Sequence, residues 1–266
     1  MKRTKIDIPL KKIKYIHHIS DVHIRNLKRH AEYEQVFERL YEKIKQNRED
    51  SIIYIGGDIA HSKTDMSPEL VDQTSRFLKS LSEICPTIVI TGNHDCNLNN
   101  LNRLDVLTPI INNLNLPNLH YLKRSGVYDI ADMSFVVWDV WEDEEDYIKA
   151  SDFEADTKVV LYHGTVDRSK TDVGFSLPGK VTIDYFDGYD LGLIGDIHKR
   201  QYLDKEKTIA YCGSLIQQNH GESIGHGYLL WEVETKKSEY IEIPNDYGYY
   251  TIDIDKGIVP DVKGMP

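Results

Sequence analysis

The amino-acid sequence predicts an α/β fold, a four-layer sandwich of two mixed β-sheets flanked by helices. In the first half of the chain, apolar runs of strand length alternate with helical stripes, which is typical of parallel crossover units. The second half, from Leu119 onward, has short apolar runs separated by Gly, Asp and Pro turns, which indicates strands. Five predicted strands end in Asp, Asn or His, so polar side chains gather where α/β sheets bind ligands.

The first half begins with a polar, basic segment at residues 1–14, where we expect a short edge strand. Buried strands are expected at residues 15–19, 52–55 and 87–91. Apolar residues at helical spacing predict helices over residues 32–44, 68–84 and 101–111. Pro68 is well placed for the first turn of the second helix.

The second half is mostly strand. Strands are expected at residues 119–122, 127–130, 133–138, 158–162, 191–194, 208–211, 228–233, 239–243 and 249–254. We expect one main domain over residues 1–255, and the start of a linker or a truncated C-terminal region at residues 256–266.

Composition limits the class of protein. The 266 residues include 32 Lys and Arg against 43 Asp and Glu, a net charge of −11, which argues against nucleic-acid binding through bulk charge alone. No apolar run approaches the roughly 20 residues that cross a membrane, and no signal peptide is recognisable. The three cysteines include no Cys-x-x-Cys pair, so we expect a reducing cytoplasmic setting without a disulfide framework.

The polar residues at the strand ends form a candidate metal-binding set. They are Asp21, His23, Asp58, Asn93, His163, Asp196 and His198. Nitrogen and oxygen ligands in that number, without a thiolate, suit two divalent ions of the Mn²⁺, Fe²⁺ or Zn²⁺ kind better than one structural zinc. On an extended backbone, Asp21 and His23 would point the same way and share one cation.

Such a centre predicts phosphoester chemistry. Two ions about 3.5–4 Å apart clamp a phosphate and turn a shared water into a hydroxide nucleophile. His94 is then free to protonate the leaving oxygen, and we expect Asp95 to orient its imidazole.

Each residue alone also has a structural interpretation. Asp21 could cap a turn, His163 could be a strand-end histidine, and Asn93 could be a left-handed turn residue beside Gly92. Only the combination favours a metal site. His17 and His18 lie within the first strand, and we expect one of them to face the core and neither to be a ligand.

The motifs resemble those of the calcineurin-like metallophosphoesterase superfamily. They are Asp21-x-His23, Gly57-Asp58, Gly92-Asn-His-Asp95, His163 and Gly195-x-x-His198. Within that superfamily, Gly56-Gly-Asp-Ile-Ala-His61 and Tyr211-Cys-Gly-Ser214 look like the SbcD-type nuclease subunit of the DNA double-strand-break repair complex.

The resemblance implies two overlapping ligand sets. The first ion would be held by Asp21, His23, Asp58 and His198. The second would be held by Asp58, Asn93, His163 and Asp196. His94 corresponds to the proton donor, and His61 to an extra histidine near the scissile phosphate. Asp196 departs from the family, which usually has histidine there, and this harder ligand favours Mn²⁺ or Mg²⁺ over Zn²⁺.

The resemblance further implies a Mn²⁺-dependent DNA exo- or endonuclease in repair or recombination, with a coiled-coil ABC-type ATPase partner and a homodimer. Basic residues after the motifs, Arg168, Lys170, Lys199 and Arg200, could follow a phosphate backbone or could be solvated loop residues. The alternatives are an enzyme for a small phosphodiester or a phosphoprotein, and a non-catalytic adaptor for the ATPase.

Overall fold

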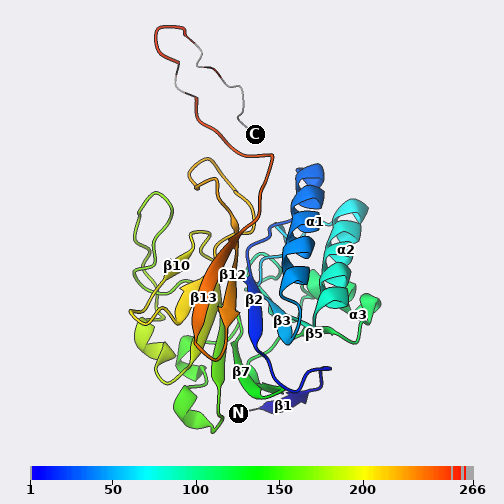
Figure 1. Cartoon of the computed structure of the whole chain (residues 1–266), viewed down its shortest axis with the longest axis vertical. Helices are drawn as coiled ribbons and strands as arrows, with labels where there is room; N and C mark the ends of the chain where they lie inside the picture. Colours follow the sequence, from blue (N-terminus) through cyan, green and yellow to red (C-terminus); the bar gives the residue numbers. More distant parts are fainter. Residues whose placement is uncertain (1, 253, 259–260, 262–266) are drawn as a thin grey trace.

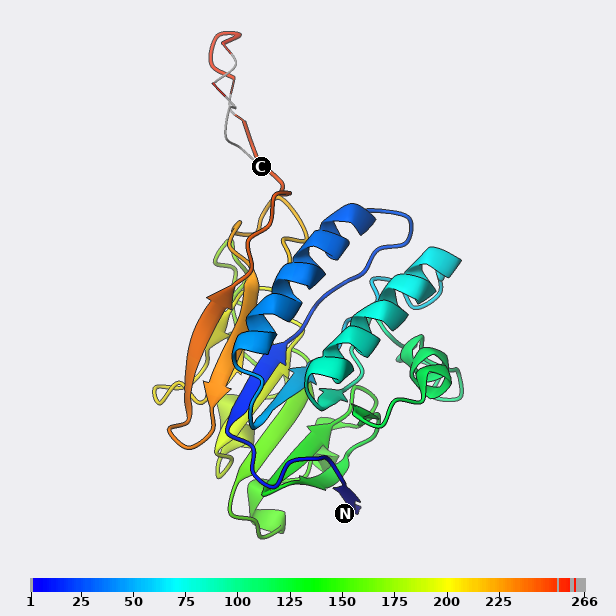
Figure 2. The same ribbon diagram turned by 45° about the vertical axis from the view of Figure 1, so that its right-hand side comes forward.

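Two mixed β-sheets lie face to face in the computed structural model, which describes residues 2–252, 254–258 and 261 (Figure 1). Three α-helices cover the outer face of one sheet, and Figures 1 and 2 both show α1 and α2 side by side. The helices are α1 (His30–Gln46), α2 (Pro68–Ile84) and α3 (Leu107–Leu114). The predicted α/β sandwich of two mixed sheets is confirmed.

The sheet beneath the helices has six strands. Their spatial order is β13 (Lys237–Glu242), β12 (Gly227–Glu232), β2 (Tyr15–Ile19), β3 (Ser51–Ile55), β4 (Thr87–Val89) and β5 (Leu119–Tyr121). The strands β2 to β5 are parallel, while β12 is antiparallel to β2 and to β13. The parallel strands therefore all deliver their carboxyl ends to one edge.

The second sheet has seven strands. Their spatial order is β1 (Arg3–Ile6), β6 (Gly126–Ile130), β7 (Met133–Trp138), β8 (Lys158–His163), β9 (Leu191–Gly195), β11 (Ile209–Tyr211) and β10 (Gln201–Tyr202). The neighbours β7, β8, β9 and β11 are parallel. The expected N-terminal edge strand is β1, and it joins this sheet by pairing with β6.

Strand β3 shows how the two cores share one sheet. Its side chains alternate, so Ile53 and Ile55 pack beneath the helices while Ile52 and Tyr54 pack between the sheets. All four are fully buried. A strand covered on both faces has to be apolar throughout, which is why the sequence around it forms one continuous apolar run.

The outer face of the seven-stranded sheet has a different cover. A third apolar cluster around Trp138 packs there against loops and short 3₁₀ helices. These are η1 (Glu144–Asp146), η2 (Ala150–Asp152) and η3 (Ile183–Phe186). The Trp138 ring stacks on Tyr147 with centroids 4.8 Å apart. Long helices therefore flank only one side of the sandwich among the described residues.

Two predicted elements are wrong. The helix expected from residue 101 begins at Leu107, and Leu101 and Leu104 are 60% and 66% exposed in the preceding loop. The Asp105 carboxylate accepts hydrogen bonds from the amides of Leu107 and Thr108, which starts the helix there. No strand covers the described part of residues 249–254.

Smaller differences concern β10, which the sequence did not indicate, and the histidines of β2. Both His17 and His18 are fully buried rather than one of them, because β2 is covered on both faces. Residues 259–260 and 262–266 of the expected linker lie outside the described residues. None of the helices in the described part of the chain combines the length and apolar character of a membrane span.

Candidate metal centre

The predicted site residues follow the carboxyl ends of five strands, three from one sheet and two from the other. Asp21 and His23 follow β2, Asp58 follows β3, and Asn93 follows β4. From the second sheet, His163 ends β8, and Asp196 and His198 follow β9. Most of these side chains are nearly inaccessible to solvent, which is costly for carboxylates unless charge or hydrogen bonds compensate.

Left-handed backbone, rather than extended strand, presents these side chains. The φ angles are 52° at Asp21, 50° at His23 and 53° at Asp58. The expectation that Asp21 and His23 share a face of extended chain is therefore wrong, although both still reach the same cluster. Each such residue costs on the order of 1 kcal/mol, and this kind of strain is concentrated at functional sites.

One cluster joins Asp21, His23 and His198. The Nε2 atoms of the two histidines lie 3.0 Å apart. The Asp21 Oδ1 atom lies 3.9 Å from His23 Nε2 and 4.0 Å from His198 Nε2. Because His198 Nδ1 donates to Glu222, the Nε2 atom of neutral His198 carries a lone pair that faces the other imidazole. A common cation satisfies this arrangement of donors.

A second cluster joins Asp21, Asp58 and His163. His163 Nδ1 donates to the Gly56 carbonyl at 2.6 Å, which leaves Nε2 directed at Asp58 Oδ1, 3.4 Å away. Although burial opposes ionisation, the charge of His163 holds the pKa of Asp58 well below its usual range. The Asn93 amide lies 2.9 Å from His163 Nε2 and 3.2 Å from Asp58 Oδ2.

Asp196 lies at the edge of the second cluster. Its Oδ1 is 4.0 Å from His163 Nε2, while Oδ2 accepts a hydrogen bond from the Thr165 hydroxyl at 2.7 Å. Its backbone amide donates to both oxygens of Asp21 at 3.2 Å. Asp196 therefore fixes Asp21 through its main chain whether or not its carboxylate binds an ion.

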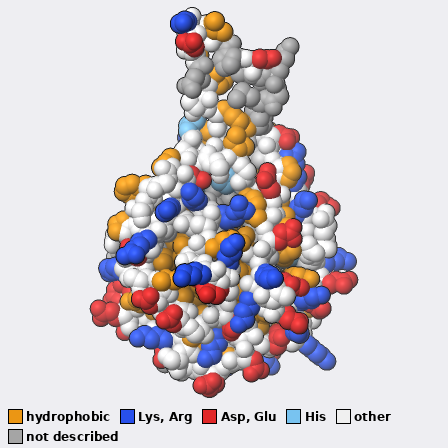
Figure 3. Space-filling model, turned by 60° about the vertical axis from the view of Figure 1, so that its left-hand side comes forward, with side chains coloured by type: hydrophobic (Ala, Val, Ile, Leu, Met, Phe, Trp, Pro, Cys, Tyr) orange, Lys and Arg blue, Asp and Glu red, His pale blue; other side chains and the backbone are white. Residues whose placement is uncertain are grey.

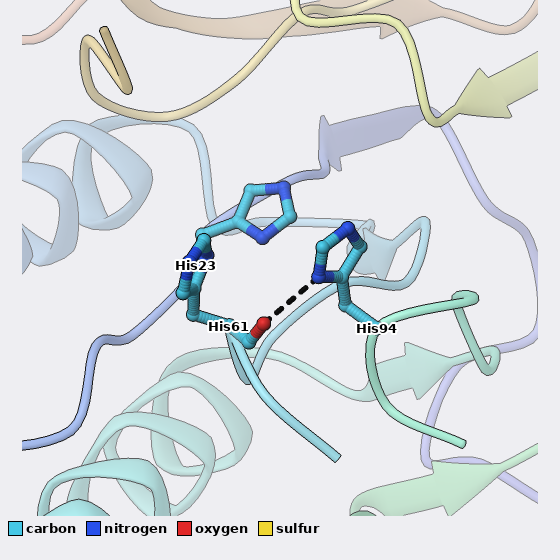
Figure 4. A group of neighbouring side chains, drawn as sticks. All are labelled: His23, His61 and His94. Carbon is cyan, nitrogen blue, oxygen red and sulfur yellow. Dashed lines mark hydrogen bonds between the residues drawn. The ribbon is translucent and has the colours of Figure 1, made fainter. Parts of the chain in front are cut away.

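A group of three histidines, His23, His61 and His94, lies against these clusters (Figure 4). His94 Nδ1 donates to the His61 carbonyl at 2.8 Å. A carbonyl only accepts, so this bond fixes the proton on Nδ1 and leaves Nε2 as the atom that can gain or lose a proton. Burial and, to a smaller extent, the charge of Arg25 lower the pKa of His61 to about 4.

Two comparisons with known proteins found matches to this chain. The family model for calcineurin-like phosphoesterase matches residues 14–246. The chain belongs to the calcineurin-like phosphoesterase family. A relative, "Uncharacterized protein R555" of Acanthamoeba polyphaga mimivirus, is 49% identical over 266 residues, which cover 94% of this chain and 20% of that protein. The chain thus spans about a fifth of that relative's length.

Calcineurin-like phosphoesterases use divalent metal ions, and the donor set of this phosphoesterase fits such ions. The residues offer imidazole nitrogens and carboxylate oxygens without a thiolate, which is the set that Mn²⁺, Fe²⁺ and Zn²⁺ accept. The negative charge of Asp58 is strong enough to raise the pKa of His163 well above its usual range against the effect of burial. The same charge attracts a cation.

Asp95 has a different role in this phosphoesterase from the predicted one. Its carboxylate accepts from the amides of Asp58, Ala60 and Gly92 at 2.8–2.9 Å. The predicted contact that orients His94 is therefore wrong, because the His61 carbonyl holds that ring instead. Asp95 ties the loops after β3 and β4 together, which sets the positions of their candidate metal ligands.

Glu222 is a residue of the candidate metal centre that the sequence does not reveal. Its side chain is 5% exposed, and Oε1 accepts from His198 Nδ1 at 2.8 Å. The Gln218 amide and the Asn219 side chain also donate to its carboxylate, at 2.6 and 2.7 Å. No local pattern marks it, because a Glu in a glycine-containing loop is ordinarily solvated.

Proposed function

We propose that this phosphoesterase is a divalent-metal-dependent DNA nuclease that hydrolyses phosphodiester bonds. The observation that carries the proposal is the convergence of nitrogen and oxygen donors from five strand ends, with the Nε2 atom of His94 beside them. Phosphodiester hydrolysis requires activation of the phosphate and a proton for the leaving oxygen. Both requirements have candidate residues at one edge of the two sheets.

The proposed ligand sets are those that the sequence predicts. One divalent ion would contact Asp21, His23, Asp58 and His198. The other would contact Asp58, Asn93, His163 and Asp196. When bound, such a pair acts as a Lewis acid on the phosphate and lowers the pKa of water. We propose Mn²⁺ because a third carboxylate increases the share of oxygen ligands.

His94 supplies the proton in this proposal. The Nδ1–H of its ring stays on the His61 carbonyl, so the second proton of the imidazolium is held at Nε2. That proton goes to the departing sugar oxygen, and the carbonyl stabilises the ring orientation in both protonation states. Because the ring packs against His23 at 4.8 Å between centroids, its donor atom stays next to the first cluster.

Basic side chains near the centre support a DNA substrate. Arg168, Lys170 and Lys199 line one cleft, and Lys199 directly follows His198 in the chain. Figure 3, which shows the side of the molecule that carries β10, has Lys and Arg side chains over the body of the molecule, interspersed with Asp and Glu. Local positive charge of this kind holds the phosphate backbone even in a protein whose net charge is −11.

The proposal is tested by incubating the chain with Mn²⁺ and either a DNA oligonucleotide, a chromogenic diester or a phosphopeptide. We expect cleavage of DNA, and a loss of about 100-fold or more in the rate for His94→Gln with DNA binding retained. The His120→Gln variant, in β5 and outside the site, is the matched control and should cleave at the wild-type rate. Hydrolysis of the diester or phosphopeptide without DNA cleavage would assign the other phosphoesterase substrates, and no turnover would assign an adaptor.

A further inference from the structure

A groove of about 490 Å³ opens beside the candidate metal centre and reaches Asp196 and His198. Its walls are a hairpin at residues 171–175 and a loop at residues 219–222. This volume lies within the range of about 300–1,000 Å³ that is typical of ligand pockets. A substrate whose phosphate lies at the metal centre therefore has its neighbouring group within reach of the groove.

The hairpin presents an apolar wall to the groove. Val173 and Phe175 are 76% and 65% exposed, which is unusual for side chains of this size. The turn is held by the Thr171 amide, which donates to the Phe175 carbonyl at 2.9 Å, and by the Gly174 amide, which donates to the Thr171 carbonyl at 2.9 Å. The exposed ring is thus carried on a hydrogen-bonded turn. In Figure 1, this yellow-green hairpin and the orange loop near residue 220 rise on the same side of the molecule.

The groove has few polar groups, and some of them are already hydrogen-bonded within the protein. The Lys199 ammonium donates to the Thr171 carbonyl at 3.3 Å and keeps further donors for a ligand. Glu222 is occupied by His198, and Asp196 by Thr165. The groove therefore offers an aromatic face, an apolar neighbour and one ammonium group, together with the Asp172 carboxylate, which also lines it. This combination fits a flat, weakly polar group that is attached to an anion.

We propose that the groove binds an unpaired nucleobase of the nucleotide next to the scissile phosphate. The inference rests on the proposed nuclease function and narrows its substrate to single-stranded DNA or a frayed duplex end. A paired base inside a duplex has its faces covered by its neighbours, whereas an unpaired base exposes a face that stacks on Phe175. Lys199 then faces the polar edge of the base or the adjacent phosphate.

The test compares binding of two fluorescent oligonucleotides of equal length, one of thymidylate and one with abasic sites throughout. The full chain is titrated in EDTA, so that binding is measured without cleavage. We expect the wild type to bind the thymidylate strand roughly tenfold more tightly, which is the size of one stacking contact. Phe175→Ala should abolish this preference, and Phe175→Trp should restore it.

Val71→Ala is the matched control, because Val71 is 37% exposed on α2 and lies outside the groove. It should keep the preference for bases. An unchanged preference in Phe175→Ala would overturn the inference and would leave the nuclease proposal standing if DNA is still cleaved with Mn²⁺. Failure of the wild type to bind either strand, together with turnover of a phosphopeptide, would overturn both.

Discussion

Among the described residues, His198 is the one proposed metal ligand that is hydrogen-bonded to Glu222. A carboxylate that accepts from the Nδ1 atom of a ligand histidine fixes the ring tautomer and raises the basicity of Nε2. Glu222 is itself held by the Gln218 amide and the Asn219 side chain, so it does not rotate freely. It is a positioning residue for one of the proposed metal ligands.

Glu222→Gln should therefore weaken Mn²⁺ binding by about 10- to 100-fold, because the amide keeps the shape of the side chain and loses its charge. Titration calorimetry measures this affinity directly. The exposed Glu206→Gln variant is the matched control and should bind Mn²⁺ as the wild type does. Equal affinity in the Glu222→Gln variant would show that His198 needs no such partner.

The sequence predicts which residues meet at the site and misses how they are held. Asp, Asn or His residues at strand ends can be recognised in the sequence, and we expect them to meet because parallel strands place their carboxyl ends at one edge of the sheet. The hydrogen-bond partners of Asp95 and His198 cannot be predicted from the sequence. Asp95 is held by main-chain amides and His198 by a loop carboxylate, and only folding brings these groups close. The left-handed backbone at Asp21 and His23 is hidden for the same reason.

At the scale of elements, the sequence predicts the start of one helix correctly and the start of another too early. Pro68 marks the start of α2 correctly, and in the structure the Ser67 hydroxyl accepts from the Leu70 amide at 3.3 Å. The start of α3 was predicted too early because Leu101 and Leu104 imitate the spacing of a buried stripe. The cap that decides the start is Asp105.

Asp105→Ala should lower the free energy of unfolding by about 2 kcal/mol, since it removes the cap of α3 and leaves two amides unsatisfied. Urea denaturation measures the change, with the exposed Asp65→Ala variant as the control. Although burial opposes it, the hydrogen bond from Lys123 lowers the pKa of Asp105. The stabilisation is thus present at neutral pH and is lost as pH falls below the ordinary aspartate pKa of about 3.9. A difference from the wild type that is unchanged at pH 3 would contradict this account.

At the scale of the whole molecule, both sheets are required for the site. Three of the five loops belong to the helix-covered sheet and two to the other, so the relative placement of the sheets decides the distance between the proposed ligands. The inter-sheet core around Tyr54 and Phe135 fixes that placement. The sequence therefore predicts which residue lies at each strand end but not the distances between the proposed ligands.

The loop before α3 is also where we propose that two copies of the chain meet. Its apolar side chains Leu98, Leu101 and Leu104 are 44–66% exposed, which favours a protein contact over solvent. Light scattering after size exclusion should give a dimer, and Leu101→Glu should give a monomer with an unaltered circular dichroism spectrum. A wild-type monomer at high protein concentration would contradict the homodimer. The proposed coiled-coil ATPase partner has to be tested separately by binding.

The central claim is that five strand ends form a site for two divalent ions. The most direct measurement is an anomalous-difference map, recorded at the manganese edge, of crystals soaked in Mn²⁺. We expect two peaks on either side of the Asp58 carboxylate, one next to His23 and His198 and one next to Asn93 and His163. A map without paired peaks at these residues would contradict it.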